Sequence, residues 1–288
     1  MEITIVEPQG YCAGVTNAIN IAYKARKDYP DRDVVVIGML VHNQEVVNEL
    51  ALAGIRTFYD PNKTNEEMLS FISKGSVIIF SAHGHDEKLD IIAKEKGLIV
   101  YDATCPKVKN NLEIIKKELE NKHQVIYIGH KNHPEALAAL SISKDVLFYD
   151  MKMGMDYSII KDTCPLVINQ TTLNTVAISS IYEEIKNKLL NARVLDEICN
   201  TTRLRQEAVK NLKDCDLIII VGDTNSSNTK RLFEIATSSH EDSIVILISN
   251  LSELDKNVFQ GINHVAIASG ASTPKNVIDE IINYIKTI

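Results

Sequence analysis

The chain has 288 residues, of which 45% are hydrophobic and 24% charged, and its formal net charge is −7. This is the composition of an ordinary globular protein, and it excludes disorder, collagen and coiled coil. The acidic balance argues against a general nucleic-acid or membrane-surface binder, because such proteins need clustered positive charge. The N-terminus lacks the pattern of a signal peptide, and no apolar run reaches the roughly 20 residues of a membrane span, so we expect a cytoplasmic protein.

Strand-like apolar runs alternate with helical patterns along the chain, which predicts an α/β protein with parallel sheets. The predicted strands are Ile3–Val6, Val34–Ile37, Val77–Phe80, Gln124–Ile128, Leu166–Asn169, Leu217–Val221, Ile244–Ile248 and His264–Ala268. At about 100–150 residues per domain, the length predicts two or three domains. The order of the runs indicates more than one sheet.

Three cysteines divide the chain almost evenly, since 93 residues separate Cys12 from Cys105 and 94 separate Cys105 from Cys199. Each opens a helical pattern. The apolar stripe is Val108, Leu112, Ile115 and Leu119 after the second cysteine, and Leu204, Ala208 and Leu212 after the third. Cys164 and Cys215 fall outside this register, so we interpret both as structural. A disulfide framework is not expected in a chain of this type.

Two further features repeat with the cysteines. A strand ending at Gly38, Gly129 or Gly222 leads into a polar loop and a helix, and a later strand leads into a second polar loop containing His83, Thr171 or Ser272. We therefore predict three αβα units related by a pseudo-threefold axis: residues 1–100 with Cys12, 101–195 with Cys105, and 196–288 with Cys199. In this arrangement the N-terminal segment lies near the centre, and the C-terminal segment is free to pack back on the first unit.

The predicted loops lie at the carboxyl ends of parallel strands or at helix N-termini, where α/β proteins bind their ligands. We expect the three cysteines to meet in one central cavity. Three thiolates would hold an iron–sulfur cubane with one open iron, or a zinc ion with one open position, and the spacing does not choose between them. No nucleotide-binding motif is present.

Polar side chains on the same loops are candidates for binding and acid–base chemistry. The histidines are His42, His83 and His133, with His85 and His130 as their close neighbours. Glu135 is a candidate proton donor for a reaction in a dry cavity. The hydroxyl and amide groups of Ser226, Ser227, Asn228 and Ser272 suit a phosphate or diphosphate anion, although serine and asparagine are also good helix caps.

Several motifs, spread in order along practically the whole chain, resemble those of the LytB/IspH family, the 4-hydroxy-3-methylbut-2-enyl diphosphate reductases. They are Gly10-Tyr-Cys-Ala-Gly-Val15, Val41-His-Asn43, Ser81-Ala-His-Gly84, Asp102-Ala-Thr-Cys-Pro106, Gly129-His-x-x-His-Pro-Glu135, Gln170-Thr-Thr-Leu173, Ile198-Cys-x-Thr-Thr-x-x-Arg-Gln-Glu207, Asn225-Ser-Ser-Asn-x-x-Arg231 and Ser269-Gly-Ala-Ser-x-Pro274. This sequence departs from the family pattern at two places. At Lys107–Leu112 family members often have a Lys and His pair, and at the position of His85 they commonly have a small apolar residue.

This resemblance implies a cloverleaf of three αβα domains around a 4Fe-4S cluster bound by Cys12, Cys105 and Cys199, with substrate at the fourth, open iron. It implies that His42, His83, His133, Ser226, Ser227, Asn228 and Ser272 bind the diphosphate and line the cavity. Thr171 and Glu135 would serve the substrate hydroxyl, with Glu135 as the proton source. The implied reaction is the last step of the non-mevalonate (MEP) isoprenoid pathway, a reductive dehydroxylation that gives isopentenyl and dimethylallyl diphosphates.

The partners implied are a small allylic diphosphate and an external electron donor such as ferredoxin or flavodoxin, with no nucleic acid and no membrane. Two alternatives remain. One is a quinolinate-synthase-like cluster dehydratase, which would need arginines for a dicarboxylate where these loops offer Ser, Asn and His. The other is a zinc- or anion-binding module without enzyme activity, which metal content and colour would distinguish.

Overall fold

The computed structural model describes residues 1–288 and contains three four-stranded sheets, all of them parallel. One sheet consists, in spatial order, of β3 (Ile55–Phe58), β2 (Val34–Ile37), β4 (Val77–Phe80) and β5 (Ile99–Asp102). The next consists of β7 (Val146–Asp150), β6 (Val125–Gly129), β8 (Leu166–Asn169) and β9 (Arg193–Val194). The last consists of β11 (Ile244–Ile248), β10 (Leu217–Val221), β12 (His264–Ser269) and β1 (Glu2–Ile5). The predicted α/β class with more than one parallel sheet is confirmed.

The helices lie on both faces of the sheets, as the alternating sequence pattern predicts. The α-helices are α1 (Ala13–Asp28), α2 (Gln44–Leu52), α3 (Asn65–Ser70), α4 (Lys88–Glu95), α5 (Pro106–Glu120), α6 (Pro134–Ser141), α7 (Thr175–Lys188), α8 (Asn200–Lys210), α9 (Ser227–Ser239) and α10 (Lys275–Ile285). Short 3-10 helices are η1 (Tyr157–Ile159), η2 (Leu251–Glu253) and η3 (Lys256–Phe259). None of the helices is both long and apolar enough to cross a membrane.

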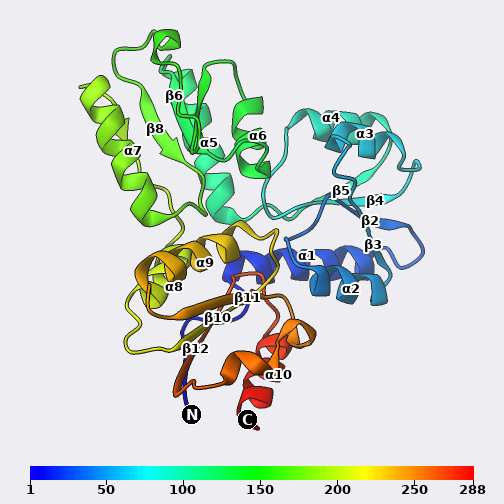
Figure 1. The fold of residues 1–288 in the computed structure, drawn as a ribbon. Helices are drawn as coiled ribbons and strands as arrows, with labels where there is room; N and C mark the ends of the chain where they lie inside the picture. Colours follow the sequence, from blue (N-terminus) through cyan, green and yellow to red (C-terminus); the bar gives the residue numbers. More distant parts are fainter. The chain divides into compact units, whose positions relative to one another are not determined.

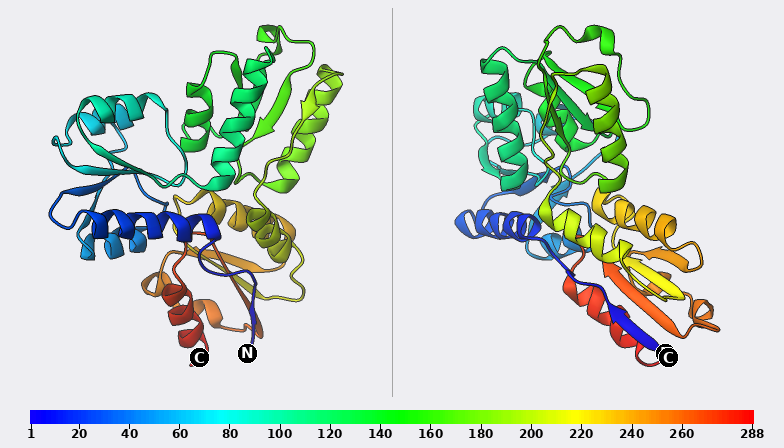
Figure 2. Two further views of the ribbon diagram at one scale, coloured as in Figure 1. Left: turned by 180° about the vertical axis from the view of Figure 1, so that it is seen from behind. Right: turned by 90° about the vertical axis from the view of Figure 1, so that its left-hand side faces the viewer.

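Each sheet is the middle layer of an αβα sandwich. In the β6–β8 sheet, α5 and α6 pack on one face and α7 on the other (Figure 2). In the β10–β12 sheet, α8 and α9 cover one face and α10 the other (Figure 1). In the β2–β4 sheet, α3 and α4 cover one face. The central strands are fully buried on both faces, which explains their continuous runs of Val, Ile and Leu.

The chain divides into two compact units. The terminal unit comprises Met1–Val15, His42–Val46 and Cys199–Ile288, and the middle unit comprises Thr16–Val41 and Val47–Ile198. Both ends of the chain lie in the terminal unit, where they are close together (Figures 1 and 2). The division into residues 1–100, 101–195 and 196–288 stays a prediction. Because β1 pairs with β12, the first strand of the chain belongs to the last sheet.

The three sheets have the same connectivity. In each, an edge strand leads along the chain to the next repeated cysteine: β5 leads to Cys105 and β9 leads to Cys199. The last sheet receives its equivalent strand from the start of the chain, because β1 pairs with β12 and leads to Cys12. The internal repeat therefore closes on itself through the N-terminal strand.

Candidate active site

Each repeated cysteine stands immediately before a helix. Cys105 is the N-cap residue of α5, Cys199 is the N-cap residue of α8, and Cys12 directly precedes α1, where its Sγ accepts a 3.5 Å hydrogen bond from the backbone N of Val15. None of the three forms a disulfide, and all are partly exposed. The positive end of a helix dipole favours a thiolate, which is the form of cysteine that binds metals.

Two of these cysteines have equivalent backbone contacts. The N–H of Cys12 donates to the carbonyl of Ala271 at 3.0 Å, and the N–H of Cys105 donates to the carbonyl of Ala82 at 2.9 Å. Ala271 precedes Ser272 and Ala82 precedes His83, so each cysteine is fixed against the second polar loop of a repeat. The sequence spacing groups Cys12 with the His83 loop, whereas the backbone contact of Cys12 goes to the Ser272 loop and that of Cys105 goes to the His83 loop.

The other two cysteines lie elsewhere. Cys215 is buried in the apolar cluster of the last sheet, among residues that include Ile218 and Leu232, and burial raises the pKa of its thiol. Cys164 lies just before β8, with its backbone N bonded to Asp162 at 2.9 Å. The structural interpretation of Cys215 agrees with this packing.

Within the middle unit, Glu135 and Thr171 form a buried pair. Glu135 is 3% exposed, and its carboxylate accepts from the backbone N of Thr171 at 2.9 Å and from the Thr171 hydroxyl at 2.8 Å. Burial raises the pKa of Glu135 to about 7, although both hydrogen bonds from Thr171 act in the opposite direction. At neutral pH this carboxyl group is therefore poised between its acid and base forms, as a general acid requires.

Two histidines lie beside this carboxyl group. The rings of His83 and His133 meet edge to face with their centroids 5.7 Å apart, and one ligand-type atom from each of His83, His133 and Glu135 lies within 4.8 Å of the others. Nδ1 of His133 accepts from the backbone N of Glu135 at 3.2 Å, which makes His133 the N-cap of α6. In its neutral form His133 must then carry its proton on Nε2, so that this atom is a donor.

Within the terminal unit, a second group of predicted residues comes together. The Ser272 hydroxyl donates to the His42 carbonyl at 3.1 Å and lies 3.5 Å from the Ser226 hydroxyl. Burial is the main cause that lowers the pKa of His42; nearby Lys230 acts in the same direction and Asp223 opposes it. These three polar residues come from three separate segments of the sequence.

Asn228 has an unusual environment. It lies in the first turn of α9, is 5% exposed, and neither its amide nitrogen nor its amide oxygen has a hydrogen-bond partner in the structure. A buried polar group without partners costs stability, and such groups call for an explanation. A polar ligand that bonds to the amide would supply one.

The helix-capping interpretation is also correct for part of the predicted site. Ser226 is the N-cap of α9, with its hydroxyl accepting from the backbone N of Thr229 at 3.4 Å. Asn43 does the same for α2, since its side-chain oxygen accepts from the backbone N of Glu45 at 2.9 Å and of Val46 at 3.3 Å. With His133 at α6, every helix that follows a repeated glycine begins at a capping residue.

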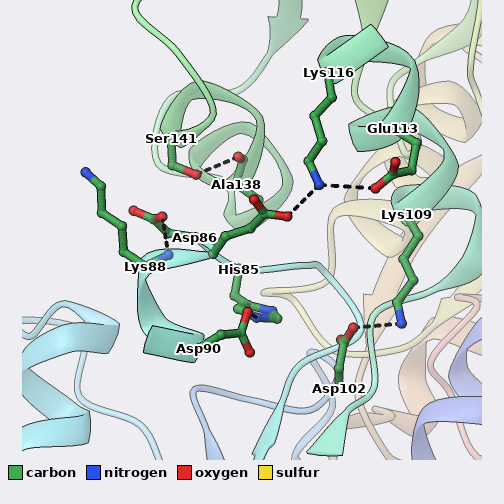
Figure 3. A network of polar contacts seen from close by, with 11 residues as sticks. His85, Asp86, Lys88, Asp90, Asp102, Lys109, Glu113, Lys116, Ala138 and Ser141 are labelled. Carbon is green, nitrogen blue, oxygen red and sulfur yellow. Dashed lines mark hydrogen bonds and ion pairs between the residues drawn. The ribbon is translucent and has the colours of Figure 1, made fainter. Parts of the chain in front are cut away.

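The two neighbouring histidines have their own contacts. The His85 ring stacks on Phe80 with a centroid distance of 3.7 Å, and its Nε2 lies 3.0 Å from the Asp90 carboxylate (Figure 3). His130 is held through its backbone N, which donates to the side-chain oxygen of Gln170 at 3.1 Å. Both residues lie on the loops that carry His83 and His133.

The lysine-rich face of α5 is occupied by ion pairs. Lys109 lies 2.7 Å from Asp102, and Lys116 lies between Glu87 and Glu113 (Figure 3). Lys107 pairs with Glu197. These lysines therefore have intramolecular partners on the polar face of α5.

One sequence prediction is wrong. The third cysteine helix, α8, does not bury an apolar stripe through Leu204, which is 47% exposed. Its buried residues are Thr202, Arg205, Gln206 and Val209. The sequence contains a sign that Arg205 and Gln206 matter, because both belong to the motif from Ile198 to Glu207. The spacing of the apolar residues, however, indicates a different buried face of the helix.

Comparison with known proteins decides the family. A family model described as LytB protein matches residues 3–286. The chain belongs to the LytB family. Members of this family are iron–sulfur enzymes, which decides against the zinc module, and membership of the LytB family itself decides against the quinolinate-synthase-like alternative.

Individual LytB relatives match over nearly their whole length. A protein of Malacoplasma penetrans named 4-hydroxy-3-methylbut-2-enyl diphosphate reductase is 36% identical over 293 residues, covering 99% of this chain and 97% of its own. A protein of Macrococcus caseolyticus with the same name is 37% identical, and the match covers 99% of this chain and 89% of that protein.

Solved LytB structures agree. The E-1-hydroxy-2-methyl-but-2-enyl-4-diphosphate reductase of Plasmodium falciparum superposes with a TM-score of 0.88 at 27% identity, covering 99% of this chain and 88% of that one. A structure of (E)-4-hydroxy-3-methyl-but-2-enyl diphosphate reductase, described as the terminal enzyme of the non-mevalonate pathway, superposes with a TM-score of 0.70 at 31% identity. Both chains are fully covered.

Proposed function

We propose that this chain is a 4-hydroxy-3-methylbut-2-enyl diphosphate reductase that removes the allylic hydroxyl of its substrate and yields isopentenyl and dimethylallyl diphosphates. The observation that carries the proposal is the Glu135–Thr171 pair, a fully buried acid poised near neutral pH, in a chain of the LytB family. The reaction breaks one C–O bond, consumes two electrons and two protons, and releases water.

We assign one 4Fe-4S cluster to Cys12, Cys105 and Cys199. The donor set fits this group, because three partly exposed thiols outside any disulfide stand at helix N-termini. Cys215 is buried in an apolar core and is not available as a fourth ligand. When bound, such a cluster supplies an open iron that acts as a Lewis acid and passes electrons one at a time.

The diphosphate would be held by neutral donors and partly buried histidines. His42, Ser226, Ser227, Asn228 and Ser272 offer ring, hydroxyl and amide groups at or near the start of α9, and His83 and His133 offer ring groups in the middle unit. The positive end of a helix and its free backbone N–H groups favour an anion. Such a site needs no large basic patch, in agreement with the acidic composition.

Glu135 would protonate the leaving hydroxyl. Its position is fixed by Thr171 from one side and by α6, which begins at the preceding residue, from the other. Burial keeps its proton bound at a pH at which an exposed glutamate would be ionised. The Thr171 hydroxyl orients the carboxyl group and would offer the substrate hydroxyl a further hydrogen-bonding partner.

The two electrons must come from outside the chain, because its sequence has no flavin or nicotinamide motif. We therefore propose a small one-electron carrier of the ferredoxin or flavodoxin class as the partner.

The test is anaerobic purification, iron and sulfide analysis, and incubation with the hydroxymethylbutenyl diphosphate and a chemical reductant. A brown protein with about four irons that forms both isomeric diphosphates is the expected result. A protein that stays colourless after cluster reconstitution, or a cluster-loaded protein that leaves the substrate unchanged, would refute the proposal.

A further inference from the structure

The buried face of α8 contains a charged residue that the proposed reaction does not yet use. Arg205 is 3% exposed, and it lies six residues after Cys199, the N-cap of the same helix. Arginine is rarely buried so completely without a partner charge. Its surroundings therefore need a specific explanation.

The guanidinium group joins two segments that are far apart in sequence. Nη1 donates to the carbonyl of Ser269 at 2.7 Å and lies 3.3 Å from its hydroxyl, and Nη2 donates to the carbonyl of Gly10 at 2.7 Å. The Ser269 hydroxyl in turn accepts from the backbone N of Gly10 at 3.1 Å. Gly10 has a φ of +71°, which a residue with a side chain rarely adopts.

These contacts fix the loop that carries Cys12. Gly10 lies two residues before Cys12, and Ser269 lies two residues before Ala271, the acceptor for the backbone N of Cys12. A single side chain from the Cys199 helix thus links the Cys12 loop to the end of β12, and the same end leads to Ser272. All of these groups belong to the terminal unit.

No carboxylate forms an ion pair with Arg205. Its three hydrogen bonds go to two carbonyls and a hydroxyl, it forms no ion pair, and its buried Nε has no acceptor. Burial lowers the pKa of the guanidinium, and the negative groups that oppose this effect are Cys12 and Glu7. A charge buried without an ion pair is destabilising, so a purely structural role does not account for it.

We propose that Arg205 is a positioning residue for the iron–sulfur cluster, which holds the Cys12 loop in place and sets a fixed positive charge beside the Cys12 thiolate. The inference rests on the proposed function. Reduction adds negative charge to a cluster, and a nearby cation in a low-dielectric environment favours the more negative state. Arg205 therefore raises the midpoint potential of the cluster and eases its reduction by the external donor.

The test compares Arg205→Gln and Arg205→Lys with the wild-type protein, each loaded with cluster and titrated for its midpoint potential by electron paramagnetic resonance. Gln keeps an amide donor without charge, whereas Lys keeps the charge without the forked geometry. We expect a clearly more negative midpoint in Arg205→Gln and a midpoint near the wild-type value in Arg205→Lys. Lys210→Met, which removes an exposed charge from the same helix, is the matched control and should leave the midpoint unchanged.

An unchanged midpoint in Arg205→Gln, or equal shifts in Arg205→Gln and Arg205→Lys, would overturn the charge role. If Arg205→Gln folds but does not load cluster while Arg205→Lys loads at the wild-type midpoint, the charge is required for loading and the inference stands. If neither loads, the charge of lysine does not replace the forked geometry of arginine, and the charge role in the inference is overturned. A wild-type protein without cluster would instead refute the proposed function, so the two failures are distinct.

Discussion

Thr171 donates two hydrogen bonds to one buried carboxylate: its backbone N to Oε2 of Glu135 at 2.9 Å and its hydroxyl to Oε1 at 2.8 Å. Both oxygens of Glu135 are thereby fixed, while burial holds its proton near neutral pH. The pair joins the start of α6 to the loop after β8, which lie 36 residues apart in sequence. A positioned acid of this kind is what a proton-consuming cleavage needs.

Glu135→Gln removes the proton while keeping the shape and one acceptor oxygen. We expect turnover to fall by about 10²–10⁴-fold, the usual contribution of a general acid, with cluster content and substrate affinity close to wild type. Single-turnover product formation and calorimetric substrate binding measure the two effects separately. Glu113→Gln, which changes an exposed glutamate on α5, is the control. Normal turnover in Glu135→Gln would remove Glu135 from the acid role.

The same carboxyl group predicts how stability depends on pH. Its pKa rises from 4.5 to about 7 on folding, so between these values the folded protein binds more protons than the unfolded chain. The free energy of unfolding therefore falls as pH rises from 4.5 to 7, by about 3 kcal/mol for this group, and the loss is complete above pH 7. Urea unfolding of the apoprotein across this range should show the decline in wild type and not in Glu135→Gln. Parallel curves for the two proteins would contradict the buried acid.

The cysteine assignment predicts two classes of variant. Cys12→Ser, Cys105→Ser and Cys199→Ser should each lose the cluster and all detectable activity, because serine is a far poorer iron ligand than a thiolate. Cys164→Ser and Cys215→Ser should keep the visible absorption and the iron content, although Cys215→Ser places a hydroxyl in an apolar core and is expected to be less stable. Iron and sulfide analysis checks the assignment. Activity retained in any of the first three variants would refute it.

The unpartnered amide of Asn228 predicts opposite effects on stability and binding. Asn228→Leu removes a buried donor and acceptor that have no partners, so we expect the apoprotein to become more stable by about 1 kcal/mol. Binding of inorganic diphosphate should weaken at least tenfold. Thermal unfolding and calorimetry measure the two changes, with Asn225→Leu at the exposed neighbouring asparagine as control. A destabilised variant with unchanged diphosphate binding would show that Asn228 is structural.

Close packing at the start of α9 predicts that a side chain at Gly270 lowers the stability of the protein. A Cβ added to Gly270 would lie 2.2 Å from Oγ1 of Thr229, and one added to Gly222 would lie 2.7 Å from the same atom. Gly270→Ala should therefore destabilise the protein by about 1–3 kcal/mol, the usual range for overpacking. The double variant Gly270→Ala/Thr229→Ala should recover most of this loss, because the obstructing hydroxyl is gone. Additive losses in denaturant unfolding would exclude this contact as the cause.

The sequence was most informative about strands in the middle of the sheets. Val34–Ile37 and Leu217–Val221 are buried on both faces, so every residue in them is apolar and the run stands out. The four strands that sequence reasoning missed are β3, β5, β7 and β9, and each lies at a sheet edge. An edge strand such as Ile55–Phe58 is only partly buried and tolerates Arg56 and Thr57, and Arg193–Val194 is too short to leave a pattern.

The candidate site shows a similar limit. Spacing along the chain predicts Cys12, Cys105 and Cys199, and a short motif predicts Glu135, because both signals can be read directly from the sequence. The role of Arg205 was missed because its partners, Gly10 and Ser269, lie 195 and 64 residues away. A helical pattern identifies the buried face of a helix only when apolar residues cover it, and the buried face of α8 is largely polar.

The pairing of β1 with β12 has a consequence for biosynthesis. Strand β1 finds its partner only after residues His264–Ser269 have been made, so β1 cannot join its sheet while the strands between β1 and β12 are being synthesised. Cys12 depends on the same late residues, since its backbone N bonds to Ala271. Contacts this distant in sequence form late and slowly. The nascent chain thus cannot complete the Cys12 loop before Ala271 has been made.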